Sequence, residues 1–114
     1  MKRHAARTAA FVAACAATLG LALQAAVGDE PKLYPLAAKG KLIFDETAGD
    51  IGCAACHGMD ARGDGGAPDI RKAGEAQIKA GLEHTGDMRG FGLTPVDVRA
   101  VAAYLIYLRK KQGI

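Results

Sequence analysis

The chain has 114 residues, and it contains three cysteines, 15 glycines and no tryptophan. A chain of this length forms one small domain at most, and such a small core often needs a disulfide, a metal or another covalent support. The formal net charge of +3 comes from Lys2, Arg3 and Arg7, since the residues after position 28 are formally neutral. Residues 29–114 therefore carry no net basic charge that would favour binding to a nucleic acid.

Residues 1–28 have the layout of a secretory signal peptide. A basic start is followed by the uncharged stretch TAAFVAACAATLGLAL and by small residues up to Gly28, after which polar residues return. We predict cleavage near Gly28, export to the periplasm and a mature domain over residues 29–114. A retained segment would instead be an inner-membrane anchor, because residues 8–27 are long enough to span a bilayer.

Cleavage at this point would leave only two of the three cysteines, Cys53 and Cys56. Free thiol pairs rarely persist in an oxidising compartment. The pair is therefore expected to form a disulfide, to hold a metal or to be consumed by another covalent bond.

The first predicted element of the mature domain is a short helix over residues 35–44, in which Leu36, Gly40, Ile43 and Phe44 share one face. A glycine inside a helix costs about 1 kcal/mol relative to alanine. We therefore expect another element to pack closely against Gly40. Residues 45–52 and 58–69 are predicted to be loops, the second because it is rich in Gly, Asp and Pro.

Two further helices are predicted, over residues 74–84 and 95–111, with a loop at 85–92 between them. The last helix carries the clearest signals: Thr94 as N-cap, Pro95 at the first position and Asp97 completing a capping box. Its basic end suits the helix dipole, and its apolar stripe consists of Val98, Val101, Leu105 and Leu108. Since no segment alternates with the period of a strand, the predicted fold is all-α, with three to four short helices and ordered loops.

The motif Cys53-Ala54-Ala55-Cys56-His57 has three chemical interpretations. Structural zinc usually requires two ligand pairs, and only His84 remains as a distant extra ligand. Thioredoxin-like redox chemistry requires a βαβ context, which the sequence lacks. Covalent haem fits best, because two thiols three positions apart form thioethers with the vinyl groups and the next histidine ligates the iron.

The residues from Gly40 to Leu108 carry a resemblance to a family. Gly40 and Phe44 resemble the Gly-xxx-aromatic face of a first helix, Tyr104, Leu105 and Leu108 resemble its C-terminal partner helix, and GAPDI after the CAACH motif resembles a Gly-Pro-x-Leu segment. Together they resemble a small bacterial class I c-type cytochrome, a cytochrome c-like fold around one covalent haem c. The resemblance implies thioethers at Cys53 and Cys56, His57 as proximal axial ligand, and a Pro68 carbonyl that accepts a hydrogen bond from that imidazole.

The same resemblance implies that Met88 is the distal axial ligand. The family has Met-Pro-x-Phe before its last helix, whereas this chain has Met88-Arg89-Gly90-Phe91, so Arg89 replaces the proline. His84 is the alternative sixth ligand. Met59 lies only two residues after His57 and is expected to pack in the loop.

A haem with two axial ligands leaves no site for a substrate, so the resemblance implies an electron carrier rather than an enzyme. It would exchange single electrons with a redox donor and a redox acceptor protein, through Fe(III) and Fe(II). Four basic residues are candidates for guiding an acidic partner: Arg62, Arg71, Lys72 and Lys79. Two alternatives stay open: a five-coordinate haem protein that binds a gas or peroxide, and a dedicated cytochrome subunit of a dehydrogenase or oxidase complex.

Overall fold

The computed structural model describes residues 30–63 and 66–114. The predicted signal peptide, residues 1–28, lies outside the described residues. Within the described part of the chain, no helix is both long and apolar enough to cross a membrane.

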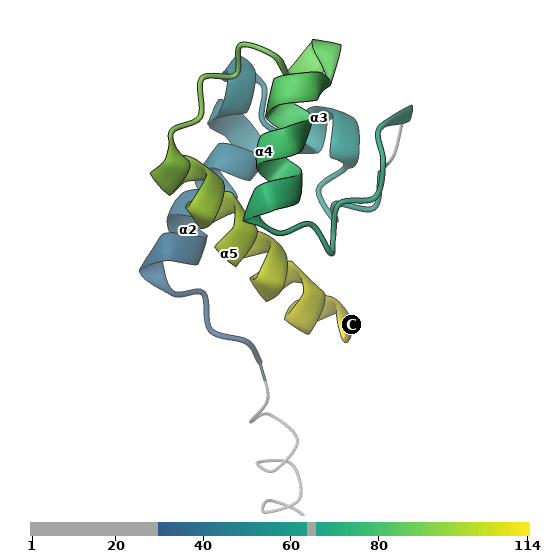
Figure 1. The fold of residues 1–114 in the computed structure, drawn as a ribbon. Helices are drawn as coiled ribbons and strands as arrows, with labels where there is room; N and C mark the ends of the chain where they lie inside the picture. Colours follow the sequence, from purple (N-terminus) through teal and green to yellow (C-terminus); the bar gives the residue numbers. More distant parts are fainter. Residues whose placement is uncertain (1–29, 64–65) are drawn as a thin grey trace, which may run out of the picture. The chain divides into compact units, whose positions relative to one another are not determined.

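The described chain is helical and contains four α-helices joined by ordered loops (Figure 1). They are α2 (Pro35–Leu42), α3 (Ala54–His57), α4 (Glu75–His84) and α5 (Pro95–Gln112). Short turns of other helix types follow α2, at Ile43–Thr47 and Ala48–Asp50, and follow α4, at Gly86–Met88. The all-α fold predicted from the sequence is confirmed.

The crossing of α2 and α5 is the largest contact between helices, and Gly40 lies at its centre. A Cβ on Gly40 would lie 1.9 Å from the carbonyl oxygen of Ala100 and 3.0 Å from the Cβ of Tyr104. The two backbones therefore touch, which only glycine allows. This confirms the close packing predicted from the cost of a helical glycine.

The predicted helix over 35–44 differs from the observed one in its end and in its buried face. The α-helix ends at Leu42 and continues as a π-helical turn over Ile43–Thr47, so the predicted loop at 45–52 is partly helical. Leu36 is 40 % exposed, and Ala37 is buried in its place. Phe44, in this π-helical turn, is fully buried, and its ring centroid lies 5.5 Å from that of Tyr104. The turn therefore contains an aromatic contact between residues that are distant in sequence.

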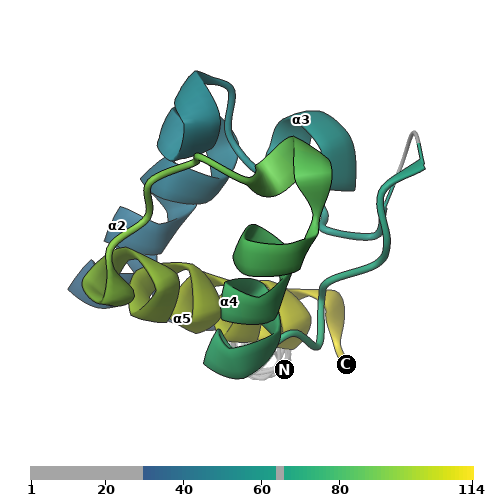
Figure 2. The ribbon, with the colours of Figure 1, turned by 45° about the horizontal axis from the view of Figure 1, so that its top comes forward.

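Helix α5 begins as the capping residues predict. The backbone N–H of Asp97 donates to Thr94 Oγ1 at 3.2 Å, and the N–H of Thr94 donates to Asp97 Oδ2 at 3.0 Å. The predicted stripe of α5 is buried, and Leu105 is completely inaccessible. This stripe joins Ile43, Phe44 and Ile78 in one core, with α2 and α4 both packed on α5 (Figure 2).

The remaining predictions place helix α4 correctly and miss α3. Helix α4 follows Gly74, whose N–H donates to Gln77 Oε1 at 3.0 Å. Residues 85–92, predicted as a loop, include the helical turn Gly86–Met88. Helix α3 is one turn long and consists of the last four residues of the CAACH motif, and its C-cap is Gly58, with a φ of 80°. The loop after it, predicted for 58–69, contains no helix or strand at 58–63 and 67–69.

Candidate haem-binding site

A cavity of about 390 Å³ lies between α3, the loop after it, α4 and α5. Its volume is within the range of small-ligand sites. The CAACH motif supplies Cys53, Cys56 and His57, and the turn before α5 supplies Met88. Most of the other lining residues are apolar, among them Ala67, Pro68, Ile70, Ala73, Ile78, Leu82, Leu93 and Val101.

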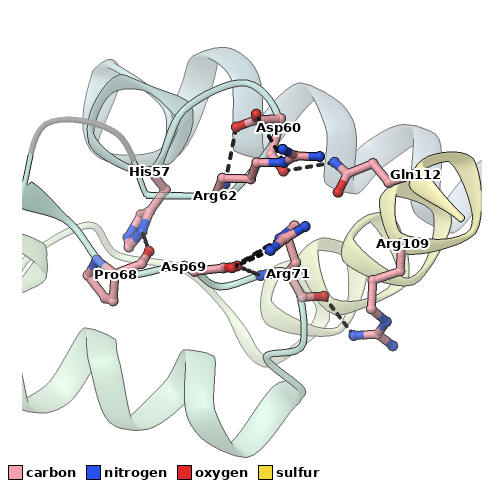
Figure 3. Close-up of polar contacts among 8 residues, drawn as sticks. All are labelled: His57, Asp60, Arg62, Pro68, Asp69, Arg71, Arg109 and Gln112. Atoms are coloured by element: carbon pink, nitrogen blue, oxygen red, sulfur yellow. Dashed lines mark hydrogen bonds and ion pairs between the residues drawn. The ribbon is translucent and has the colours of Figure 1, made fainter. Parts of the chain in front are cut away.

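The His57 imidazole is buried, at 5 % exposure, and oriented by one hydrogen bond. Its Nδ1 lies 2.8 Å from the carbonyl oxygen of Pro68 (Figure 3). A carbonyl can only accept, so Nδ1 must carry the proton and donate. The other ring nitrogen, Nε2, then has its lone pair free for a metal.

The two motif cysteines differ in exposure. Cys53 is buried and Cys56 is exposed, and no disulfide joins them. Burial raises the pKa of the Cys53 thiol to about 11, and the nearby Asp45 carboxylate adds to the rise. A catalytic redox cysteine needs a lowered pKa, so the environment of Cys53 opposes the thioredoxin-like interpretation.

Of the two candidate sixth ligands, only Met88 lines the cavity. It approaches α4 at Gly81, where a Cβ would lie 3.6 Å from the Met88 methyl group and 3.8 Å from its sulfur. The His84 side chain is 77 % exposed, and its Nε2 lies 4.0 Å from a carboxylate oxygen of Glu83. Met59 is also exposed, at 61 %, and does not line the cavity.

The residues around the cavity fit a haem c. Two thiols at the required spacing, an imidazole with Nε2 available and a thioether sulfur all line one mainly apolar cavity. Zinc fits less well, because the described residues contain no group of three or more His, Cys, Asp or Glu side chains suited to a metal. A second hollow, of about 480 Å³ between α4 and the start of α5, contains no residue of the motif.

The four basic residues proposed to guide a partner do not line the described cavity. Arg62 and Arg71 pair with nearby carboxylates, at 3.5 Å from Asp60 and 2.6 Å from Asp69. Lys79 lines the second hollow instead. None of these four side chains therefore contributes a charge to the lining of this cavity.

Several residues of the site were missed by sequence reasoning. Ala73, in the loop before α4, and Gln77, a polar residue of α4, line the cavity, but neither a loop residue nor a polar helix residue gives a short-range signal that it faces a cavity. Ile78 and Leu82 carry such a signal, since their spacing on the predicted helix places them on one face.

Residues 37–85 match a family model described as Cytochrome c. The matched segment runs from α2 to the residue after α4 and contains the complete CAACH motif. No curated protein and no solved structure matches the chain. The matched segment, the helical fold and the CxxCH motif together support a c-type cytochrome, a haem-based electron carrier whose cofactor is covalently attached haem c.

Proposed function

We propose that this protein is an exported, periplasmic monohaem cytochrome that carries single electrons between a donor and an acceptor protein. Bound haem c supplies reversible one-electron exchange between Fe(III) and Fe(II). The role of the chain is to hold the group in one geometry in both oxidation states and to exclude water from it.

In this proposal, Cys53 and Cys56 would hold the haem through thioethers, and His57 and Met88 would be the protein ligands of its iron. The bond to Pro68 fixes the His57 tautomer and raises the basicity of the ring. With both axial positions taken by protein side chains, no position remains for a substrate, which favours a carrier over an enzyme.

One observation carries the proposal. The His57 ring, held by the Pro68 carbonyl at 2.8 Å, shares a single cavity with both cysteines and with the thioether of Met88. This set of groups matches what a His/Met-ligated haem c requires.

Visible spectroscopy of the exported, haem-loaded protein tests the proposal. We expect sharp low-spin bands in the reduced protein that carbon monoxide does not change, and a weak red methionine–iron band in the oxidised protein. Met88→Ala should abolish the red band and make the reduced protein sensitive to carbon monoxide. Met59→Ala is the matched control, because Met59 is exposed and outside the cavity.

Other spectra would contradict the proposal in different ways. A high-spin wild-type spectrum that shifts with carbon monoxide would indicate an open iron and a gas- or peroxide-binding protein. An unchanged red band in Met88→Ala would reject Met88 as the ligand. Export is tested separately, since the N-terminal sequence of the periplasmic protein should begin near Asp29.

A further inference from the structure

The hydrogen bond between His57 and Pro68 depends on a loop with no regular structure of its own. The two residues are 11 positions apart, and residues 58–63 and 67 between them belong to no helix or strand. Pro68 is exposed, and proline has no N–H to donate. The position of its carbonyl must therefore be set by its neighbours along the chain and by contacts from other elements.

Two side chains from the last turn of α5 hold this loop. Arg109 Nη1 donates to the carbonyl oxygen of Arg71 at 2.8 Å, and Gln112 Nε2 donates to the carbonyl oxygen of Asp60 at 2.9 Å (Figure 3). The two acceptors lie at equivalent places, because Asp60 is three residues after His57 and Arg71 is three residues after Pro68. Three residues after His57, and again three residues after Pro68, the backbone is thus hydrogen-bonded to the last turn of α5. We call these two bonds, from Gln112 and from Arg109, the tethers.

The helix turn that supplies the tethers is itself well anchored. Leu105 and Leu108, just before it, are buried in the core. The helix ends after Gln112 at Gly113, which has the left-handed φ of 77° typical of a helix C-cap. Arg109 and Gln112 are three residues apart and therefore lie on one side of the helix.

The environment of Gln112 also indicates that water does not readily replace its hydrogen bond to the Asp60 carbonyl. Its amide Oε1 is buried and has no hydrogen-bond partner among the described residues. Breaking the bond to Asp60 would leave a second polar atom of the same amide without a protein partner, which is unfavourable for a group that is partly buried. The bond to Asp60 is therefore expected to persist in the folded protein.

Backbone hydrogen bonds also connect the two limbs of the loop, which are the chain after His57 and the chain after Pro68. The N–H of Ile70 donates to the carbonyl of Ala61 at 3.0 Å, and the N–H of Gly63 donates to the carbonyl of His57 at 2.8 Å. On the second limb, the Asp69 carboxylate accepts from the backbone N–H of Arg71 at 3.0 Å. A displacement at either tether can therefore reach the Pro68 carbonyl through a few backbone bonds.

We infer that Arg109 and Gln112 are positioning residues for the proximal histidine. They fix the loop so that the Pro68 carbonyl stays within hydrogen-bond distance of His57 Nδ1. Neither side chain touches the ring; both act through the backbone of the loop. The inference rests on the proposed function, in which His57 is the proximal ligand.

The experiment uses the haem-loaded protein and three variants. Arg109→Met removes the guanidinium donor but keeps a long side chain, and Gln112→Glu keeps the shape but removes the amide donor. Lys110→Ala is the matched control, because Lys110 lies between the two and its side chain is exposed. NMR measures the solvent exchange rate of the His57 Nδ1 proton, electrochemistry measures the midpoint potential, and denaturation measures global stability.

Each tether variant should speed exchange of the His57 Nδ1 proton roughly fivefold, the factor expected for weakening one hydrogen bond. The midpoint potential should rise, because a less basic imidazole stabilises oxidised iron less. Lys110→Ala should match the wild type in both measurements. A fourth variant, which combines Arg109→Met with Gln112→Glu, should show a larger change than either substitution alone. If it does not accumulate with haem, the comparison rests on the two single variants.

The result that would contradict the inference can be distinguished from a general loss of stability. If the tether variants are less stable but keep the wild-type proton exchange rate and potential, the tethers are structural only and the inference is wrong. Failure of the proposed function would appear earlier, in the wild type, as a protein without haem or with a His57 proton that shows no ligand-type paramagnetic shift when oxidised.

Discussion

Gly63 lies directly against Pro68: a Cβ on Gly63 would lie 2.6 Å from the carbonyl carbon of Pro68 and 2.4 Å from the carbonyl oxygen of Ala67. Real Cβ atoms do not approach backbone so closely, so only glycine fits at this position. The absence of a side chain at Gly63 thus allows the Pro68 carbonyl to reach the His57 ring.

Gly63→Ala should displace the Pro68 carbonyl and weaken its bond to His57. A net loss of about 1 kcal/mol for one hydrogen bond corresponds to a midpoint potential higher by roughly 40 mV for a one-electron couple. Gly113→Ala is the control, because Gly113 also has a positive φ, 77°, but is exposed, lies outside the cavity and would have no atom within 4 Å of an added Cβ. Equal midpoint potentials in the two variants would show that backbone strain alone changes the potential, and that the contact between Gly63 and Pro68 has no special role.

Gly40→Ala should disrupt the crossing of α2 and α5. The added methyl group would overlap the Ala100 carbonyl, at 1.9 Å, and neither helix backbone can move without loosening the core. Overpacking of this kind costs about 3 kcal/mol, which guanidinium denaturation followed by circular dichroism would measure. Gly86→Ala, where no atom lies within 4 Å, should change stability by less than about 0.5 kcal/mol.

The helices could be predicted from the sequence where the signals are local. Thr94, Pro95 and Asp97 mark the start of α5 because a capping box involves only four consecutive residues. The π-helical turn could not be predicted in this way. It places Phe44 against Tyr104 of α5, a contact that depends on how two distant helices cross.

The residues of the candidate site also fall into those that the local sequence predicts and those that it does not. Cys53, Cys56 and His57 form a local motif, and their chemistry can be read from their spacing. Pro68 and Met88 follow only from the family resemblance. The sequence pattern places Arg109 in a basic helix end matched to the dipole, whereas the side chain donates to a backbone carbonyl 38 residues away. No periodicity or composition signals a side chain-to-backbone bond of that separation.

The Met88 segment should depend on the contact between Gly49 and Phe91. A Cβ on Gly49, which has a φ of 57°, would lie 2.5 Å from two carbons of the Phe91 ring. Gly49→Ala should therefore push the ring away and loosen the segment that carries Met88. We expect a weaker red methionine–iron band and roughly tenfold tighter binding of added imidazole, equivalent to about 1.4 kcal/mol.

Gly90→Ala is the control for this variant. Gly90 also has a positive φ, 89°, with no atom within 4 Å, and it is closer to Met88 in sequence. If Gly90→Ala loosened methionine ligation as much as Gly49→Ala, local backbone strain would explain the effect, and the packing of Phe91 on Gly49 would have no special role.

The capping box of α5 should make stability dependent on pH in the acid range. Hydrogen bonds from Lys39 and from Thr94 lower the pKa of Asp97 from 3.8 to about 2, and Lys39 Nζ lies 2.9 Å from its Oδ1. Because the pKa is lowered by folding, the stabilising contribution of Asp97 is complete above about pH 4 and is lost as the pH falls through 2.

Asp97→Asn tests this dependence, since the amide keeps the shape of the carboxylate but cannot titrate. At pH 7 the variant should be less stable than the wild type by at most about 1 kcal/mol, because Lys39 is half exposed and the ion pair is screened by water. Urea denaturation should show this difference shrinking as the pH falls from 4 through 2, because the wild-type carboxylate becomes protonated over this range. Glu46→Gln, at an exposed carboxylate on the π-helical turn, is the control for the loss of one negative charge. A difference between Asp97→Asn and wild type that stays constant from pH 7 to pH 2 would mean that the hydrogen-bond geometry of the cap, and not its charge, stabilises the start of α5.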